Sequence, residues 1–299
     1  TSAWFKMWHD DAPEKATSAF EAVFNHRAGL VPPWELLEDR RLREGNSPTR
    51  TDEGWNRPGK VLWRNYWPER MRSLQLAAPG VEIVPFENSE EALQHVSDAD
   101  ALIGTANAEL LAAGNSLRWV QVGSAGVERY LRIPELAAGE VLLTNGQRLA
   151  SEVIGEHVMA LTRALARGLN RAATAKDDGE WKRREIGNNA PLTKLRGKTM
   201  LVVGLGGIGT EVARLADGVG MRVLAIRNSR RAGPPFVDRV GLGEDLPAYL
   251  AEADVVANCL PLTDDTKGQF DAELFRLMKP SAFFINVGRG GTVVTGDLI

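Results

Sequence analysis

The sequence predicts an α/β protein with two doubly wound parallel sheets, one in each of two domains. Three observations support this prediction. Short β-rich runs alternate with helical stretches in residues 60–144, a second alternation fills residues 198–299, and a glycine-rich turn joins a strand to a helix at the start of the second series. Such alternation is typical of parallel sheets that carry helices on both faces.

Composition limits the classes of protein to which this chain can belong. Of the 299 residues, 43% are apolar and 25% are charged, which is typical of a globular chain long enough for two domains. The formal net charge is −3 and basic residues are spread along the chain, so we expect no nucleic-acid partner. No apolar run reaches the ~18 residues that span a bilayer, so we expect no membrane partner. The single cysteine, Cys259, excludes an internal disulfide and favours a cytoplasmic location.

Residues 1–56 form an N-terminal extension outside this pattern. It holds four of the eight tryptophans among many charges, and one stretch, "LVPPWELLEDRRLREG", predicts a short helix. Two interpretations stay open: the extension packs on a neighbouring surface, or it is a loosely ordered leader.

Residues 57–150 are predicted to form the first domain. Its strands are predicted by five β-rich runs: "KVLW", "VEIV", "ALIG", "RWVQV" and "VLLT". Helical stretches such as "PERMRSLQLAA" and "NSEEALQHV" separate them. In the second stretch Asn88 is at the N-cap position and Glu91 follows three residues later, close to the capping box that marks a helix start. This order predicts an open parallel sheet.

Residues 151–299 are predicted to form the second domain, which begins with a long helix over "SEVIGEHVMALTRALARGLNRA". Acidic residues lie in its first turns and arginines towards its end, which matches the helix dipole. Its apolar stripe would consist of Ile154, Val158, Leu161, Leu165 and Leu169. The second sheet is predicted by four β-rich runs: "KTMLVVG", "RVLAI", "DVVANCL" and "AFFINVG".

The segment "MLVVGLGGIGTEVARLADGVG" combines an apolar strand, a glycine-rich turn and a helix. Gly204, Gly206 and Gly209 have the G-x-G-x-x-G spacing, and Gly207 and Ile208 complete the turn. Here Gly204 permits the tight turn, Gly206 lets the backbone approach a pyrophosphate, and Gly209 lets helix and strand pack closely. The helix N-terminus offers N–H groups and a partial positive charge to that anion. The segment therefore predicts a Rossmann dinucleotide-binding domain.

The loop after the second strand of this domain favours NADP over NAD. Arg227 lies 18 residues beyond Gly209, near the position where an acidic residue binds the ribose 2′-hydroxyl of NAD. In place of an acidic residue, this loop has side chains that can donate hydrogen bonds to a 2′-phosphate: Arg227, Asn228, Ser229, Arg230 and Arg231. We therefore expect NADP as the preferred cofactor, with NAD as the other dinucleotide that the turn admits. A solvated basic loop is the alternative interpretation.

Three motifs at these spacings resemble the D-isomer-specific 2-hydroxyacid dehydrogenases: "VVGLGGIG", "ANCLPLTDDTKG" and "FFINVGRGG". The "GSAGVERY" loop and the "ASEVIGEHVMALTRALAR" helix fit the same pattern. The resemblance runs from about residue 60 to the end of the chain. It implies a flavodoxin-like substrate domain beside the Rossmann domain, a substrate cleft between them, and a homodimer with the helix from Ser151 near its interface.

The resemblance also implies roles for single residues. The backbone N–H groups of Ala125 and Gly126 would bind the substrate carboxylate, and Glu128 stands where an aspartate is commoner. Cofactor-lining positions are implied at Leu260, Pro261 and Val287. Arg289 matches the catalytic arginine, which also binds substrate. This role suits its chemistry, because a guanidinium is planar, bidentate and always charged, and Arg289 follows a buried strand, where open α/β sheets bind ligands.

The expected function is hydride transfer between NADP(H) and a small 2-keto or 2-hydroxy acid, of the glyoxylate or hydroxypyruvate type. That small acid is then the expected partner. Two alternatives stay open. Corepressors with this fold sense dinucleotides to control assembly, and formate or phosphite dehydrogenases use the same scaffold.

Other features of the sequence complete these expectations. No metal site is expected, because the four histidines and Cys259 show no metal-ligand spacing. His157 is interpreted as a structural residue among core positions. The histidine and glutamate that the family uses for proton transfer lie downstream of "NVGRG", and the chain ends ten residues after Arg289. We therefore expect these 299 residues to belong to a longer protein and to reduce keto acids very poorly alone.

Overall fold

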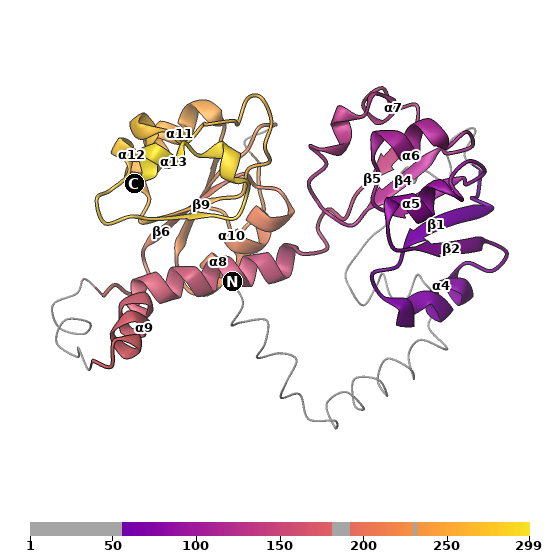
Figure 1. Cartoon of the computed structure of the whole chain (residues 1–299). Coiled ribbons are helices and arrows are strands. Elements are labelled where there is room, and N and C mark those ends of the chain that lie inside the picture. The colour runs from indigo at the N-terminus through magenta and orange to yellow at the C-terminus, as the bar shows by residue number, and fades with distance from the viewer. Residues whose placement is uncertain (1–55, 181–191, 230–231) are drawn as a thin grey trace. The chain divides into compact units, whose positions relative to one another are not determined.

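The computed structural model describes residues 56–180, 192–229 and 232–299. The chain divides into two compact units (Figure 1). The described residues of the first unit are 56–121 and Ala138–Thr144, and those of the second are Val122–Ala137 and the described part of Asn145–Ile299. The predicted helix in "LVPPWELLEDRRLREG" lies outside the described residues.

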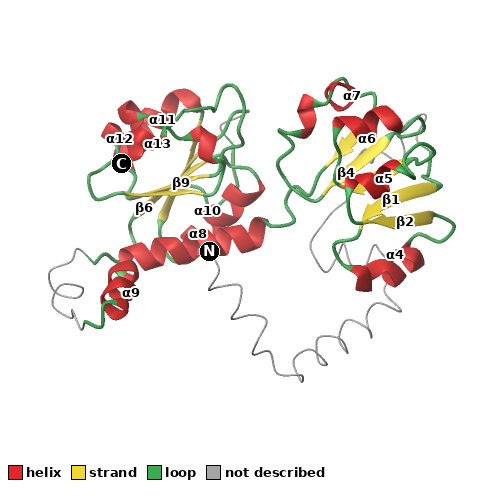
Figure 2. Ribbon diagram, in the orientation of Figure 1, coloured by secondary structure: helices red, strands yellow, loops and turns green. Residues whose placement is uncertain are grey.

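The first unit is built on a five-stranded sheet (Figure 2). Its strands are β1 (Lys60–Arg64), β2 (Glu82–Phe86), β3 (Ala101–Gly104), β4 (Trp119–Val122) and β5 (Leu142–Thr144). The pairs β1–β2, β1–β3 and β4–β5 are parallel, and Leu62 in the centre stands opposite Val84 and Leu102. The order β2-β1-β3-β4-β5 is the flavodoxin-like order, which confirms the predicted fold class.

Two of the short helices in the first unit begin at asparagine caps. The helices are α4 (Met71–Ala77), preceded by the 3₁₀ turn η2 (Pro68–Arg70), α5 (Ser89–Leu93) and α6 (Ala108–Ala113). The Asn88 side chain accepts a hydrogen bond from Glu91 N–H at 3.0 Å, and Asn107 accepts one from Leu110 N–H at 2.8 Å. The Glu91 carboxylate accepts from the N–H of Glu87 rather than of Asn88, so the predicted capping box is displaced by one residue.

Asp100 ties together the amino ends of three strands in the first unit. Its carboxylate accepts hydrogen bonds from Gly59 N–H at 2.6 Å, from Lys60 N–H at 3.1 Å and from the Arg118 guanidinium at 3.0 Å. Partial burial raises the pKa of this carboxyl, but the two backbone N–H donors and Arg118 outweigh burial, so the pKa lies below its usual 3.8. The ionised carboxylate therefore stabilises the folded sheet.

Replacing Asp100 by asparagine is expected to destabilise the first unit by about 1–3 kcal/mol, because the charged acceptor is lost. Since folding lowers the pKa of Asp100, its contribution is fully present above the pKa in the unfolded chain, about 3.9. That contribution is lost as the pH falls through the lower pKa of the folded state. The difference between variant and wild type should persist from neutral pH to about pH 4 and shrink below it.

Hydrogen exchange of peptides from residues 57–121, followed by mass spectrometry across this pH range, measures the effect. Asp98→Asn is the matched control, because Asp98 is exposed and its ion pair with Lys60 contributes little. An equal loss of protection in both variants would show that Asp100 has no special role.

The second unit is built on another five-stranded sheet, whose described pairs are all parallel. Its strands are β6 (Thr199–Val203), β7 (Arg222–Ile226), β8 (Arg239–Gly241), β9 (Val255–Asn258) and β10 (Phe283–Asn286). The order β10-β9-β6-β7-β8 is that of the Rossmann fold, with the switch point between β6 and β9. β8, which the sequence analysis missed, and β10 are the edge strands.

The second unit also contains several helices, of which α8, α10 and α11 contact its sheet (Figure 2). The α-helices are α7 (Pro134–Ala137), α8 (Ser151–Ala166), α9 (Leu169–Asp177), α10 (Gly207–Gly218), α11 (Leu246–Glu252), α12 (Ala272–Leu277) and α13 (Thr295–Leu298). The 3₁₀ turns are η3 (Tyr130–Arg132), η5 (Gly243–Asp245) and η6 (Gly290–Thr292). In the part of the chain that the structure describes, no helix has both the length and the apolar character that a bilayer span requires.

The long helix predicted over residues 151–172 is in fact two helices. Gly168 adopts a left-handed conformation, with φ of +63°, and ends the helical path between α8 and α9. The predicted apolar stripe is also wrong in part, because Leu161 and Leu169 are exposed. The buried face of α8 consists of Ser151, Gly155, Val158, Met159, Thr162 and Ala166. His157 is exposed rather than placed among core residues.

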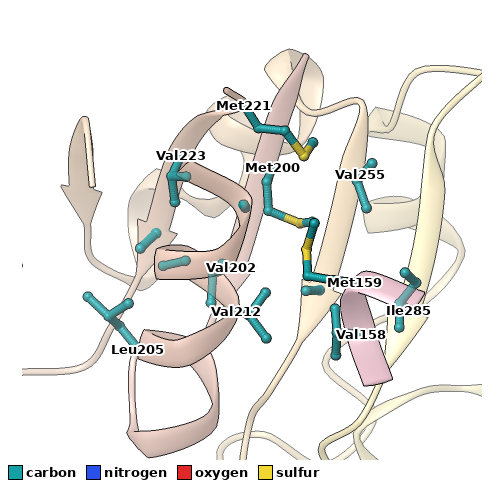
Figure 3. Close-up of a cluster of buried hydrophobic side chains, with 14 residues drawn as sticks. Val158, Met159, Met200, Val202, Leu205, Val212, Met221, Val223, Val255 and Ile285 are labelled. Atoms are coloured by element: carbon teal, nitrogen blue, oxygen red, sulfur yellow. The ribbon is translucent and has the colours of Figure 1, made fainter. Parts of the chain in front are cut away.

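Side chains on the two faces of strand β6 pack in two separate hydrophobic clusters. Met200 and Val202 point to one face, where they join Val158, Met159 and Met221 (Figure 3). Leu201 and Val203 point to the other face. They pack in a cluster with Leu246, Leu250 and Phe270. Every residue of β6 is buried, as is typical of a central parallel strand with helices on both sides.

Candidate functional site

The glycine-rich turn connects the carboxyl end of β6 to the start of α10. Gly204 has a φ of +100°, which side chains disfavour, and a Cβ on it would lie 3.0 Å from the carbonyl group of Cys259. A Cβ on Gly209 would lie 2.0 Å from the carbonyl oxygen of Gly204 and 2.9 Å from Val202 Cγ1. Both glycines are therefore required by close backbone packing within the turn.

Gly206 differs from these two glycines because the space beside it is open. A Cβ on Gly206 would meet nothing within 4 Å, and no side chain caps the N-terminus of α10. The N–H groups in the first turn of a helix lack partners within that helix and carry partial positive charge. Gly207 and Ile208 stand in this first turn. The turn thus offers uncapped donors and free space, which fits the pyrophosphate of a dinucleotide.

The loop after β7 holds the residues predicted to bind a 2′-phosphate. Asn228 and Ser229 are exposed, whereas Arg227 is partly buried. The Arg227 guanidinium donates a hydrogen bond to the carbonyl oxygen of Ala232 at 2.9 Å, and its buried Nε has no partner among the described groups. Arg230 and Arg231 lie outside the described residues. The described start of the loop, residues 227–229, therefore presents polar donors and no acidic side chain.

A buried polar network joins the carboxyl ends of β9 and β10. The fully buried Asn258 donates from Nδ2 to Thr292 Oγ1 at 2.8 Å, and its Oδ1 accepts from Leu260 N–H at 3.2 Å. Thr292 Oγ1 in turn donates to the Arg289 carbonyl oxygen at 2.7 Å. Val287 N–H donates to the Asn258 carbonyl oxygen at 3.0 Å. The network holds three residues predicted from the sequence, namely Leu260, Val287 and Arg289.

Pro261 continues the chain beyond this network into a tight loop. Its carbonyl oxygen accepts a hydrogen bond from Thr266 Oγ1 at 2.6 Å. The Thr266 hydroxyl oxygen also accepts a hydrogen bond from Thr263 N–H at 2.8 Å. The threonines thereby fix the path of the segment after β9 through hydrogen bonds to backbone groups.

Arg289 lies against the loop that contains Ala125 and Gly126. A Cβ on Gly126 would lie 2.0 Å from Arg289 Nη2, and Arg289 Nε donates to Glu128 Oε1 at 3.2 Å. The guanidinium is half-buried, with 42% of the side chain exposed. It also donates from NH1 to the carbonyl oxygen of Gly288 at 3.0 Å. The structure therefore brings Arg289 to Gly126 and Glu128, although 161 residues separate it from Glu128 in the sequence.

The loop itself is braced so that its N–H groups remain available. Asn145 Nδ2 donates to the Ala125 carbonyl oxygen at 2.8 Å, and Ser124 Oγ donates to the Gly126 carbonyl oxygen at 2.8 Å. In the described parts of the chain, no acceptor faces the N–H groups of Ala125 and Gly126. Two adjacent free N–H groups beside a guanidinium can bind a carboxylate.

Sequence reasoning missed two residues that shape this site. The sequence pattern places Asn258 in an apolar strand, and the only signal of its role is that a polar residue stands at the end of a buried run. Arg148 has a φ of +72° and is the only non-glycine residue with positive φ in the described ranges. A Cβ on Gly207 would lie 2.9 Å from Arg148 Cγ, so Arg148 packs on the glycine turn. No signal in the sequence pointed to Arg148.

Other chemistries have little support in the described residues. No group of three or more histidine, cysteine or acidic side chains there could hold a metal ion. Burial raises the pKa of the Cys259 thiol to about 12. A thiol with so high a pKa is a poor nucleophile near neutral pH, which agrees with a packing role.

The two sheets and the glycine turn define a dinucleotide-binding α/β protein of the doubly wound type. Residues 159–299 match the family described as D-isomer specific 2-hydroxyacid dehydrogenase, NAD binding domain. A glyoxylate/hydroxypyruvate reductase B of Klebsiella pneumoniae is 31% identical over 250 residues, which cover 81% of this chain and 76% of that protein. The chain therefore belongs to the D-isomer specific 2-hydroxyacid dehydrogenase family.

Two further proteins show how far the likeness extends. A glyoxylate/hydroxypyruvate reductase B of Citrobacter koseri is 35% identical over 217 residues, which cover 71% of this chain and 66% of that protein. The chain thus spans slightly less than two thirds of that relative. The NADPH-dependent glyoxylate/hydroxypyruvate reductase of Sinorhizobium meliloti, solved with NADP and sulfate, superposes with a TM-score of 0.67 at 26% identity. That alignment covers 80% of this chain and 76% of the other.

Proposed function

We propose that this protein is an NADP(H)-dependent oxidoreductase that interconverts small 2-keto and 2-hydroxy acids, with glyoxylate and hydroxypyruvate as substrates. The observation that carries the proposal is the contact of the Arg289 guanidinium with the Gly126 loop, whose N–H groups are free to bind a carboxylate. Family membership and the named activities of the relatives support the same reaction.

In this proposal each part of the candidate site has one task. The N–H groups of Ala125 and Gly126 bind the substrate carboxylate, and Arg289 holds that carboxylate and polarises the ketone. Glu128 orients the guanidinium before substrate arrives, and the substrate carboxylate then competes with Glu128 for the same donors. NADPH, when bound, would supply the hydride, and the histidine that the family resemblance places downstream of Arg289 would supply the proton to the ketone oxygen.

The cofactor would be held by residues from three loops of the second unit. The pyrophosphate would be bound by the turn of Gly204, Gly206, Gly207, Ile208 and Gly209. The 2′-phosphate would be bound by Arg227, Asn228, Ser229, Arg230 and Arg231. The nicotinamide half would be lined by Leu260, Pro261 and Val287. Open space at Gly206 and the uncapped start of α10 support this arrangement.

Activity measurements with the full-length protein test the reaction class. NADPH oxidation with glyoxylate, hydroxypyruvate and pyruvate measures keto-acid reduction, and NADP⁺ reduction with formate and phosphite measures the rival oxidations. Turnover confined to the keto acids supports the proposal. Turnover confined to formate or phosphite, or binding of NADPH without turnover of any acid, would refute it.

Replacing Arg227 or Arg230 by alanine is expected to weaken NADPH binding selectively. Loss of one charge-assisted contact to the 2′-phosphate costs about 1.5–3 kcal/mol, or roughly ten- to a hundredfold in affinity. NADH lacks that phosphate, so its dissociation constant should change far less. Fluorescence titration of each variant with both cofactors gives the two ratios. Equal losses for NADPH and NADH would mean that the arginines only maintain the loop.

The domain roles and the assembly follow from the same proposal. Residues 57–150 would form the substrate domain, residues 151–299 the cofactor domain, and residues 1–56 an N-terminal extension. We also propose a cytoplasmic homodimer that pairs through α8 and α9. Exposed apolar side chains there support this surface, because they would gain from burial against a second copy; they are Val153, Leu161 and Leu169.

A further inference from the structure

The second unit has a cleft at the amino ends of its strands, away from the glycine turn. Its volume is about 640 Å³. The cleft is lined by the starts of β6 and β7 and by the segments that lead into β6, β9 and β10. The lining residues are Lys194, Arg196, Gly197, Lys198, Thr199, Arg222, Glu252, Asp254 and Lys279. A volume of this size is within the range of small-molecule sites, about 300–1,000 Å³.

The lining of this cleft is strongly basic although the chain as a whole is acidic. Five lining side chains are cationic and two are anionic, which leaves an excess of three positive charges. Two charged residues next to the cleft, Asp238 and Arg239, have opposite charges and do not change this excess. Asp238 pairs with Arg222, and Arg239 pairs with Glu252. Since the formal net charge of the chain is −3, this positive cleft is a local feature. Concave surfaces of one charge sign concentrate ions of the opposite sign.

Ion pairs within the cleft leave part of its positive charge free. Asp254 accepts from Lys279 Nζ at 3.2 Å and from Lys198 Nζ at 3.4 Å, and Glu252 accepts from Arg222 NH1 at 2.9 Å. These two acids thereby hold three of the cations in place. The remaining two, Lys194 and Arg196, are exposed and have no acidic partner within the described ranges.

The cleft is separate from the candidate cofactor site. Thr199 at the start of β6 lines the cleft, whereas Gly204 follows the other end of the same strand. A strand rises about 3.3 Å per residue, so the five residues of β6 separate the two places by roughly 16 Å. A ligand in the cleft would therefore not occupy the glycine turn.

We propose that this cleft is a second anion site, which binds the oligophosphate group of a small molecule such as pyrophosphate or a nucleoside diphosphate. An oligophosphate matches the excess of three positive charges, and lysine and arginine are the side chains that bind phosphate best. Lys194 and Arg196, which have no acidic partner among the described residues, supply two further cations, and the arginine can donate two parallel hydrogen bonds. Lys198 and Lys279, held by Asp254, supply further N–H donors.

Calorimetric titration of the full-length protein tests the site, with inorganic pyrophosphate and ADP as the two probes. Each probe is titrated with and without saturating NADPH, at low and high salt. We expect binding that persists in the presence of NADPH and weakens with salt. Equal affinities would assign recognition to the phosphates alone, and tighter ADP binding would add a contact to the nucleoside; both results support the site.

The double variant Lys194→Ala/Arg196→Ala should weaken both probes roughly ten- to a hundredfold. Arg276→Ala is the matched control, because Arg276 is exposed on α12 and lies outside the cleft lining. Absence of binding at low salt, displacement of the probes by NADPH, or equal affinity of wild type and double variant would overturn the proposal. Circular dichroism of the double variant shows whether it remains folded.

Discussion

Replacement of Arg289 by lysine is expected to lower kcat for glyoxylate about a hundredfold while NADPH binding stays nearly unchanged. Lysine keeps the positive charge but loses the planar fork that contacts the carboxylate and the ketone together. Its ammonium also cannot reproduce the separate hydrogen bonds that the guanidinium makes with Glu128 and Gly288. Steady-state kinetics give kcat and KM, and a fluorescence titration gives the dissociation constant of NADPH.

Arg276→Lys controls for a general effect of the arginine-to-lysine change, because Arg276 is exposed on α12 and makes no contact with the site. This control should retain full activity. Near-normal turnover by Arg289→Lys would show that the guanidinium fork does not act in the reaction. Loss of NADPH affinity in the same proportion as turnover would place Arg289 with the cofactor instead of the substrate.

Replacement of Gly209 by alanine is the second change with a large expected effect. The new methyl group would lie 2.0 Å from the Gly204 carbonyl oxygen, so α10 and the turn would have to move apart. Overpacking of this kind costs about 1–3 kcal/mol, and here the displaced groups are those that would bind the pyrophosphate. We expect a lower midpoint of urea unfolding and at least a tenfold loss of NADPH affinity.

Gly218→Ala is the matched control within the same helix. A Cβ on Gly218 would meet nothing within 4 Å, so alanine should be tolerated or slightly stabilising there. If Gly209→Ala bound NADPH as tightly as Gly218→Ala does, the close approach of α10 to the turn would not matter for the cofactor.

The two sheets could be predicted because their strands are short apolar runs that alternate with helices. β6 and β7 illustrate this, since every residue of β6 and four of the five residues of β7 are buried. Burial on both faces makes such strands visible in the sequence. β8 was missed for the opposite reason, because it has three residues and only one of them is buried.

The break between α8 and α9 shows a second limit. The helical pattern continues on both sides of Gly168. One glycine lowers the stability of a helix by only about 1 kcal/mol, so its presence in the sequence does not establish that a helix ends there. Only the left-handed conformation of Gly168 reveals that the helix stops there. The face of α8 that is buried depends on its packing against α10, where a Cβ on Gly155 would lie 3.0 Å from Glu211 Cβ.

The glycine turn of the candidate site could be predicted from its spacing together with the apolar strand before it and the helix after it, because each glycine meets a local backbone constraint. Arg289 and Gly126 were predicted through a family resemblance. Their contact could not be predicted from local pattern, since Arg289 and its partner Glu128 are 161 residues apart in the sequence. Asn258 acts through a buried network whose members come from different segments, so only the folded chain brings them together.

We propose that the protein reduces 2-keto acids with NADPH and recognises them by their carboxylate. The most direct test compares hydroxypyruvate with dihydroxyacetone, in which a hydroxymethyl group replaces the carboxylate, in NADPH oxidation by the full-length protein. We expect turnover of hydroxypyruvate and no NADPH oxidation above background with dihydroxyacetone. Comparable rates with both compounds, or no oxidation with hydroxypyruvate by protein that binds NADPH, would contradict it.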